Sequence, residues 1–242
     1  MKKIILYLLI TIPIFSFAQN EKVTWDYPAK SGSEEWKTLK NQKEKLAICQ
    51  IPEEILKNIS TLELMEICFK YPLIYDALTF HTIQFGMDQL RINFNGFDEL
   101  MKRDNIADLL IARYSNFHPK GYNKNWTDIQ KGYFSLEIIV TEIFLSQDDV
   151  ISKMTLPQKK ELVQLLLLKQ AEKEDKEIYD RMSHISIGFA LAKILRSSGF
   201  SMEKYTKETK ADIEAFSTHG NFQNTQILPY LLESAKEFTL KY

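Results

Sequence analysis

Few side chains in this sequence are of the types that carry catalysis or bind metal ions. The chain of 242 residues has four histidines and two cysteines. The histidines are His81, His118, His184 and His219. None belongs to an H-E-x-x-H, H-x-x-E-H or C-x-x-C arrangement, the spacings that bring metal ligands together. The sequence therefore predicts no metal site and assigns no catalytic residue.

Two of the histidines stay candidates for a pocket. His81 lies in LTFHTIQF, which predicts a histidine packed in the core of an apolar helix. His184 lies in RMSHISIGF, where it either faces a pocket or packs against neighbours. A third candidate is Trp126, which follows the clearest loop, HPKGYNKNW. Its ring could stack on a sugar or a partner, but we favour packing at the start of the next helix.

Signatures of nucleophilic and phosphate chemistry are missing. The sequence contains no G-x-S-x-G, no G-x-G-x-x-G and no G-x-x-x-x-G-K-[ST], which argues against common nucleotide-dependent reactions. No cofactor is predicted. Glu137 and Glu142 fall on one predicted helix, but five positions apart they point in different directions. They are therefore not expected to act as a carboxylate pair.

The elements that must position these residues are helices. Apolar residues return every three or four positions, and long alternating runs of Val, Ile and Thr are missing. Ser60 with Glu63 predicts a helix start, and Tyr71-Pro72 predicts its end. We expect an all-α fold, an irregular helical array or α-solenoid-like bundle of about eight to eleven helices. No repeated residue pattern accompanies the repeat-like helix lengths.

Four of the predicted helices are long. They cover residues 74–94, about 127–145, 176–196, and a stretch that opens at Thr155-Leu156-Pro157. The last one contains LVQLLLL, a run too continuous for a helix with one buried face. We expect this run at the centre of the C-terminal half.

The N-terminus predicts export. Lys2 and Lys3 precede an apolar run from Ile4 to Phe15, and Ser16-Phe17-Ala18 has the form of a cleavage site. The run is shorter than the roughly twenty apolar residues that cross a bilayer. No cysteine follows it, which argues against a lipoprotein. We expect a signal peptide over 1–18 and a mature protein in the periplasm or outside the cell, not in the membrane.

Composition and charge limit the class of protein to which the mature chain can belong. We expect a flexible segment over 19–33 and a single all-α domain over 34–242, with a sub-boundary near 117–126. Hydrophobic residues make up 45% and charged residues 26%, which is typical of a globular protein. The formal net charge of the whole sequence is −1, and removal of Lys2 and Lys3 with residues 1–18 makes the mature chain more negative. It therefore lacks the basic character of a nucleic-acid-binding protein.

Cys49 and Cys68 are a disulfide candidate, because exported proteins meet oxidising surroundings. A helical hairpin turning near Ile59 would place the two cysteines at similar distances from the turn, so that their sulfurs could meet. Such a bridge would stabilise the fold by about 3 kcal/mol in the chain-entropy model. Two buried thiols, or a reactive Cys68, are the alternatives.

Two phrases carry a family resemblance. CQIPEEILKNISTLELMEICFKYPL and FNGFDELMKRDNIADLLIARY resemble a group of exported, helix-rich proteins of Gram-negative bacteria without an assigned activity. The resemblance spans residues 45–115. It implies an exported helical domain and transfers no catalytic residue.

Two functions are compatible with these observations. The first is a non-enzymatic binding or interaction domain that holds a protein or small-molecule partner in a groove between helices. The alternative is a periplasmic hydrolase with a pocket between the N-terminal helices and the 176–196 helix, using His184 or His81 as its acid–base group. A catalytic pocket would bring one of these histidines within hydrogen-bond distance of a carboxylate or thiol.

Overall fold

The structure is a computed structural model that describes residues 23–173, 175, 177–221 and 223–242. In these residues it has thirteen α-helices and three short 3-10 helices, and no β-strand, which confirms the predicted all-α class. There are more α-helices than the predicted number of about eight to eleven, because the N-terminal part is divided into several short helices. The predicted signal peptide, residues 1–18, lies outside the described residues.

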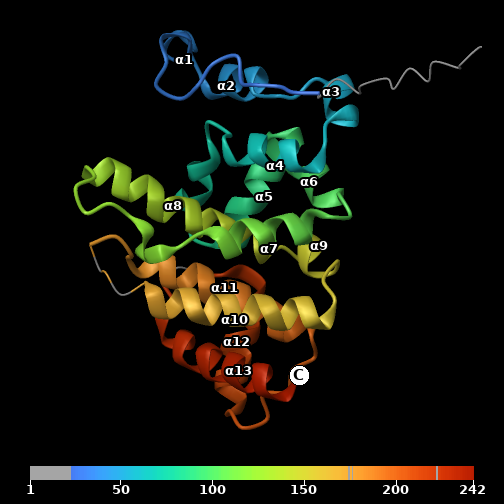
Figure 1. Cartoon of the computed structure of the whole chain (residues 1–242), viewed down its shortest axis with the longest axis vertical. Helices are drawn as coiled ribbons and strands as arrows, with labels where there is room; N and C mark the ends of the chain where they lie inside the picture. Colours follow the sequence, from blue (N-terminus) through green and yellow to red (C-terminus); the bar gives the residue numbers. More distant parts are fainter. Residues whose placement is uncertain (1–22, 174, 176, 222) are drawn as a thin grey trace, which may run out of the picture.

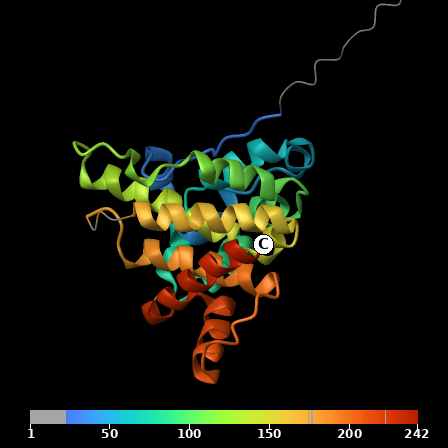
Figure 2. The same cartoon turned by 60° about the horizontal axis from the view of Figure 1, so that its bottom comes forward.

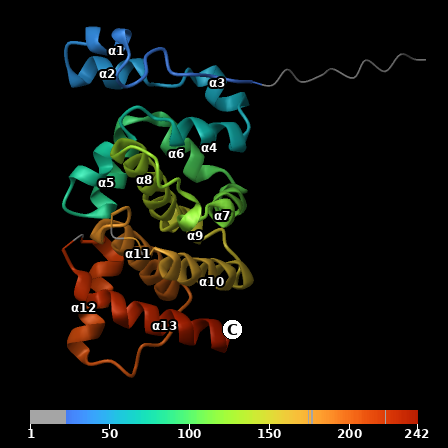
Figure 3. The ribbon, with the colours of Figure 1, turned by 60° about the vertical axis from the view of Figure 1, so that its left-hand side comes forward.

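The helices form three layers along the long axis, as Figures 1 and 3 show. The first layer holds α1 (Glu34–Thr38), α2 (Gln42–Ile48) and α3 (Glu53–Asn58). The middle layer holds α4 (Thr61–Phe69), η1 (Ile74–Thr79), α5 (Ile83–Asn93), α6 (Asn95–Lys102), α7 (Ile106–Asn116), η2 (Pro119–Gly121), α8 (Asp128–Leu145) and α9 (Asp148–Ile151). The third layer holds α10 (Leu156–Glu172), α11 (Arg181–Ser197), α12 (Lys207–His219), η3 (Thr225–Ile227) and α13 (Leu228–Lys241).

One hydrophobic cluster of buried residues extends from Tyr27 to Phe238 through all three layers. Figure 2 shows α10 lying alongside α7, which joins the third layer to the middle one. The predicted sub-boundary near 117–126 falls between α7 and α8, and these two helices contact each other. None of the described helices is both long enough and apolar enough to cross a bilayer.

The centre of the C-terminal half is α11, not the LVQLLLL run of α10 as predicted. Twelve of the seventeen residues of α11 are buried, and the helix contacts α8, α9, α10, α12 and α13. Small residues such as Ser186, Gly188 and Ala190 let its neighbours approach closely. In α10, by contrast, only four of the seventeen residues are buried and Leu168 is 55% exposed, although the helix contacts α7, α11 and α13.

The predicted helix over 74–94 is broken into η1 and α5. Thr82 caps α5 through a hydrogen bond from the Phe85 N–H to its hydroxyl. The two pieces fold back on each other so tightly that a Cβ at Gly86 would lie 2.1 Å from the Ala77 carbonyl oxygen. Only glycine permits this approach.

The segment before α1 was expected to be flexible over 19–33, but its described part packs on the core. Tyr27 and Ala29 are buried, and the Tyr27 hydroxyl donates to the Ile67 carbonyl at 2.9 Å. The Tyr27 ring meets Trp25 edge to face and also lies against Phe94. The segment has no secondary structure of its own and is held by the burial of Tyr27 against Phe94 and by its hydrogen bond to α4.

Candidate functional site

Three adjoining cavities form a groove between α4, η1, α7 and α8. Their volumes are about 650, 490 and 450 Å³. The first and second cavities have six lining residues in common, Glu66, Phe69, Lys70, Ile74, Tyr75 and Tyr133. The second and third have Glu66, Arg113 and Glu137 in common. We call this continuous feature the α4–α8 groove.

Local helix geometry aligns the groove residues on each wall. On α4, Glu66, Phe69 and Lys70 are three and four positions apart and therefore share one face. On α8, Tyr133 and Glu137 are four apart and share another. Thr127 begins α8 with a capping box, which fixes where its groove face starts.

Arg113 joins the two walls in a cluster with Glu66 and Glu137. Its Nη1 donates to Glu66 Oε1 at 2.7 Å and its Nη2 donates to Glu137 Oε1 at 2.7 Å. The guanidinium carbon lies 4.0 Å from the centre of the Phe69 ring, a cation–π contact. The Arg113 side chain is 21% exposed and those of Glu66 and Glu137 are 40% and 45% exposed. We call these three residues the Arg113 cluster.

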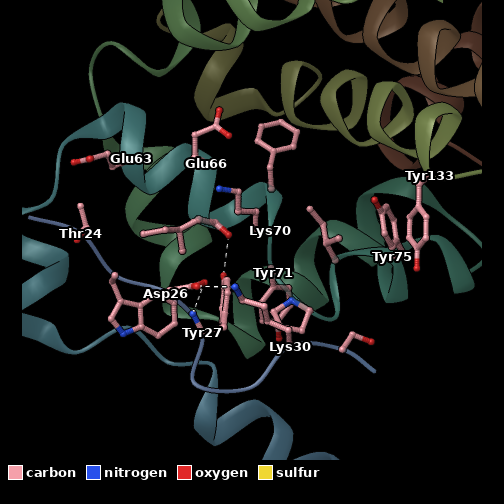
Figure 4. A pocket seen from close by; sticks show the side chains of 16 residues that line it. Thr24, Asp26, Tyr27, Lys30, Glu63, Glu66, Lys70, Tyr71, Tyr75 and Tyr133 are labelled. Carbon is pink, nitrogen blue, oxygen red and sulfur yellow. Dashed lines mark hydrogen bonds and ion pairs between the residues drawn. The ribbon is translucent and has the colours of Figure 1, made fainter. Parts of the chain in front are cut away.

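Aromatic rings line the groove beside this cluster. The Tyr75 and Tyr133 rings lie 5.9 Å apart, centre to centre, and Tyr133 is 57% exposed. Figure 4 shows these two tyrosines on one side of the first cavity, with Asp26 and Lys30 on the other and Lys70 between them. The groove therefore offers solvent-facing rings and charged groups along one path.

Charges in the groove are nearly balanced. The lining carries four acidic and three basic side chains, Asp26, Glu63, Glu66 and Glu137 against Lys30, Lys70 and Arg113. The Lys30 ammonium lies 2.7 Å from Asp26 and lowers the pKa of that carboxyl. In the described residues, no group of three or more His, Cys, Asp or Glu side chains is arranged to hold a metal ion.

A second group of charges is enclosed where α7, α8, α10 and α11 meet. Lys173 Nζ donates to both carboxylate oxygens of Glu142, at 2.9 and 3.0 Å, and to the Ser183 carbonyl at 2.6 Å. The Tyr114 and Ser186 hydroxyls donate to the same carboxylate. Both side chains of the ion pair are fully buried. We call these residues the Glu142 cluster.

Burial governs protonation in the Glu142 cluster. Desolvation lowers the pKa of Lys173, while the Glu142 charge opposes that shift. Desolvation and the same carboxylate raise the pKa of Tyr114. None of the three groove cavities reaches this cluster, so its chemistry is that of a closed, fully paired core network.

The structure brings neither candidate histidine into the groove. His81 was predicted in a helix core and is exposed instead, because the chain turns there between η1 and α5. His184 is partly buried on α11 and pairs through Nδ1 with the Gln170 amide. Burial, and then the nearby Lys173 charge, lower the pKa of His184.

The candidate disulfide is not formed, and Cys49 and Cys68 are both buried free thiols. The prediction compared distances from the turn near Ile59, which come level only along two continuous antiparallel helices. Cys49 lies before α3, at the C-terminal end of the separate helix α2. Burial raises the pKa of Cys49 to about 11 and raises that of Cys68 as well. The arrangement matches the alternative of two buried, unreactive thiols.

Trp126 is the one candidate that lines the groove, in its second cavity. Its ring also packs edge to face on Phe134, with the centres 5.4 Å apart. The expected packing at the start of α8 is therefore confirmed, and the same ring forms part of the groove wall.

The main groove residues were not identified from the sequence as candidates for a site. Glu66, Arg113 and Glu137 belong to three different helices and follow no short motif. The sequence held one signal, at Glu137. Because Glu137 and Glu142 are five positions apart on one helix, their side chains were expected to point in different directions. The structure confirms this separation, since Glu137 lies in the groove and Glu142 in the core.

Comparison of the chain with protein-family models, with curated proteins and with solved structures finds no match. The groove itself is therefore the basis for a functional argument.

Proposed function

We propose that this protein is an exported, non-enzymatic binding protein whose ligand occupies the α4–α8 groove. The observation that carries the proposal is the Arg113 cluster on the groove wall, whose two carboxylates are partly exposed and which lies beside the Tyr75 and Tyr133 rings. Aromatic surface combined with a few placed polar groups is the usual composition of a ligand site. The signal peptide expected over 1–18 supports export.

The hydrolase alternative has less support. Its candidate acid–base groups, His81 and His184, do not line the groove. Within the described residues the hydrogen-bond partner of His184 is the Gln170 amide and not a carboxylate or thiol. Glu66 and Glu137 both accept from a single guanidinium. This geometry favours binding over bond cleavage.

A thermal-shift screen of the mature chain tests the proposal. The panel contains neutral oligosaccharides, acidic oligosaccharides, extended peptides, amphipathic helical peptides and single amino acids. At least one class should raise the melting temperature of the wild type, because a ligand that binds only the folded state stabilises it. The same ligand should shift Tyr133→Ala much less, relative to that variant's own melting temperature.

Ile129→Ala is the matched control. Ile129 lies one turn before Tyr133 on α8, is 72% exposed, and lines none of the three cavities. It should respond as the wild type does. A panel in which no class stabilises the protein, or in which Tyr133→Ala responds fully, would overturn the proposal.

A further inference from the structure

We propose that the ligand of the α4–α8 groove is a neutral oligosaccharide chain, an inference that rests on the binding function proposed above. The first argument is size. The volume of each of the three cavities falls within the range of roughly 300–1,000 Å³ that is usual for small-molecule sites. Because they adjoin, a ligand made of several linked units can occupy all three.

The second argument is the placement of aromatic rings. Trp25 lines the first cavity, Tyr75 and Tyr133 line both the first and second, and Trp126 lines the second. Rings spaced along a groove give repeated flat apolar surfaces. Pyranose units present an apolar face of C–H groups at each repeat, and their hydroxyls stay at the edge, where tyrosine and tryptophan accommodate polar neighbours.

The third argument is hydrogen bonding. Arg113 uses only Oε1 of Glu66 and Oε1 of Glu137. Among the described residues, the second oxygen of each carboxylate accepts no hydrogen bond from a protein donor. Sugar hydroxyls both donate and accept, so they can meet carboxylate oxygens and cationic donors within the same short span.

The fourth argument is charge. A polyanion would gain no net attraction from a lining that carries four acidic and three basic side chains. A cation would compete with Arg113, which already lies between the two carboxylates. A neutral ligand has neither disadvantage.

Peptides fit this groove less well than sugars do. A peptide that binds by strand addition needs a sheet edge, and the described residues contain no sheet. A helical peptide lays an apolar face into an apolar groove. Here that face would cover Arg113, Glu66 and Lys70 and remove them from water, which is costly for charged groups.

Tryptophan fluorescence of the mature protein, supported by calorimetry, tests the ligand class. The probes are neutral hexasaccharides of β-linked glucose, β-linked xylose and N-acetylglucosamine. A hexamer of galacturonate is the anionic control, and deacetylated chitohexaose is the cationic counterpart of the N-acetylglucosamine probe. Trp25 and Trp126 line the groove, so binding should change the emission. At least one neutral probe should bind at least about tenfold more tightly than both charged controls.

Variants separate groove binding from surface adsorption. Tyr133→Ala should weaken the best neutral probe at least about tenfold, and Ile129→Ala should leave its affinity unchanged. Groove-dependent binding of a peptide or a charged oligomer, without a neutral sugar, would overturn this inference and leave the binding function standing. If no class binds in the groove, both proposals fail. Release of new reducing ends from a bound hexasaccharide would instead show an enzyme.

Discussion

The Arg113 cluster and the Glu142 cluster share two helices, α7 and α8, and differ in access to water. Arg113 and Tyr114 are neighbours on α7, and Glu137 and Glu142 lie on α8. The side chains of Arg113 and Glu137 lie in the groove, whereas those of Tyr114 and Glu142 lie in the core. In one cluster a cation shares two half-exposed carboxylates, whereas in the other a cation meets one fully buried carboxylate.

This difference in burial separates a structural role from a binding role. All three donors of the Lys173 ammonium are used, and both oxygens of Glu142 accept two hydrogen bonds each. Such a network holds the helices in one arrangement and has no unused group to offer. The Arg113 cluster keeps acceptor oxygens at the edge of a cavity, where a ligand can use them.

The largest expected effect comes from breaking the buried pair. Glu142→Gln leaves the Lys173 ammonium enclosed without its counter-charge, and should lower the free energy of unfolding by about 3–5 kcal/mol. Urea unfolding followed by circular dichroism measures it. The double variant Glu142→Gln with Lys173→Met removes the lone charge and should recover part of the loss. A single-variant loss below about 1 kcal/mol would show that water reaches the cluster.

A smaller effect is expected for one hydroxyl of the same cluster. Tyr114→Phe removes the 2.8 Å hydrogen bond to Glu142 and should cost about 1.5–3 kcal/mol, because the acceptor is charged. Tyr179→Phe is the matched control, since that buried hydroxyl donates to the neutral Pro119 carbonyl. It should cost about 0.5–1.5 kcal/mol. Equal losses in urea unfolding would argue against a charged Glu142.

The groove pair should couple weakly in comparison. A double-mutant cycle with Arg113→Met and Glu137→Gln should give a coupling energy of about 0.2–1 kcal/mol in unfolding experiments, because solvent screens half-exposed charges. The same substitutions should abolish groove binding. A coupling as large as that of the buried pair would remove the distinction between the two clusters.

The smallest effect concerns His184, which lies against the Glu142 cluster. Gln170, Lys173 and Asp180 are the groups that influence its ring. Its pKa in the folded protein is below the ordinary value, so the unfolded chain takes up the proton first. Stability should therefore be complete above about pH 6.5 and decline as the pH falls through the folded-state pKa.

NMR titration of the His184 ring and unfolding at about pH 8 and pH 5 check this. His184→Gln should flatten the acid-side decline. Lys173→Met should raise the pKa of His184, because one neighbouring positive charge is gone. A pKa of His184 that does not respond to Lys173→Met would contradict a charged lysine in the buried cluster.

Local features of the fold could be predicted from the sequence because their causes are local. Thr127 begins α8 and Ser60 begins α4, each by capping the N–H three residues later. Periodicity predicted the all-α class, and helix geometry predicted that Glu137 and Glu142 diverge. The prediction failed at His81, because the chain turns there between η1 and α5, two short helices that periodicity had merged into one.

By itself, then, the sequence determined which segments are helical, where several of them begin, and which residues share a helix face. Tertiary structure decided which faces meet. Arg113 is 47 residues from Glu66 and 24 from Glu137, and Lys173 is 31 from Glu142. Helix caps act over one turn, whereas these contacts depend on how α4, α7, α8, α10 and α11 pack. Packing also decided which charges are enclosed and which line the groove, because access to water is a property of the assembled layers.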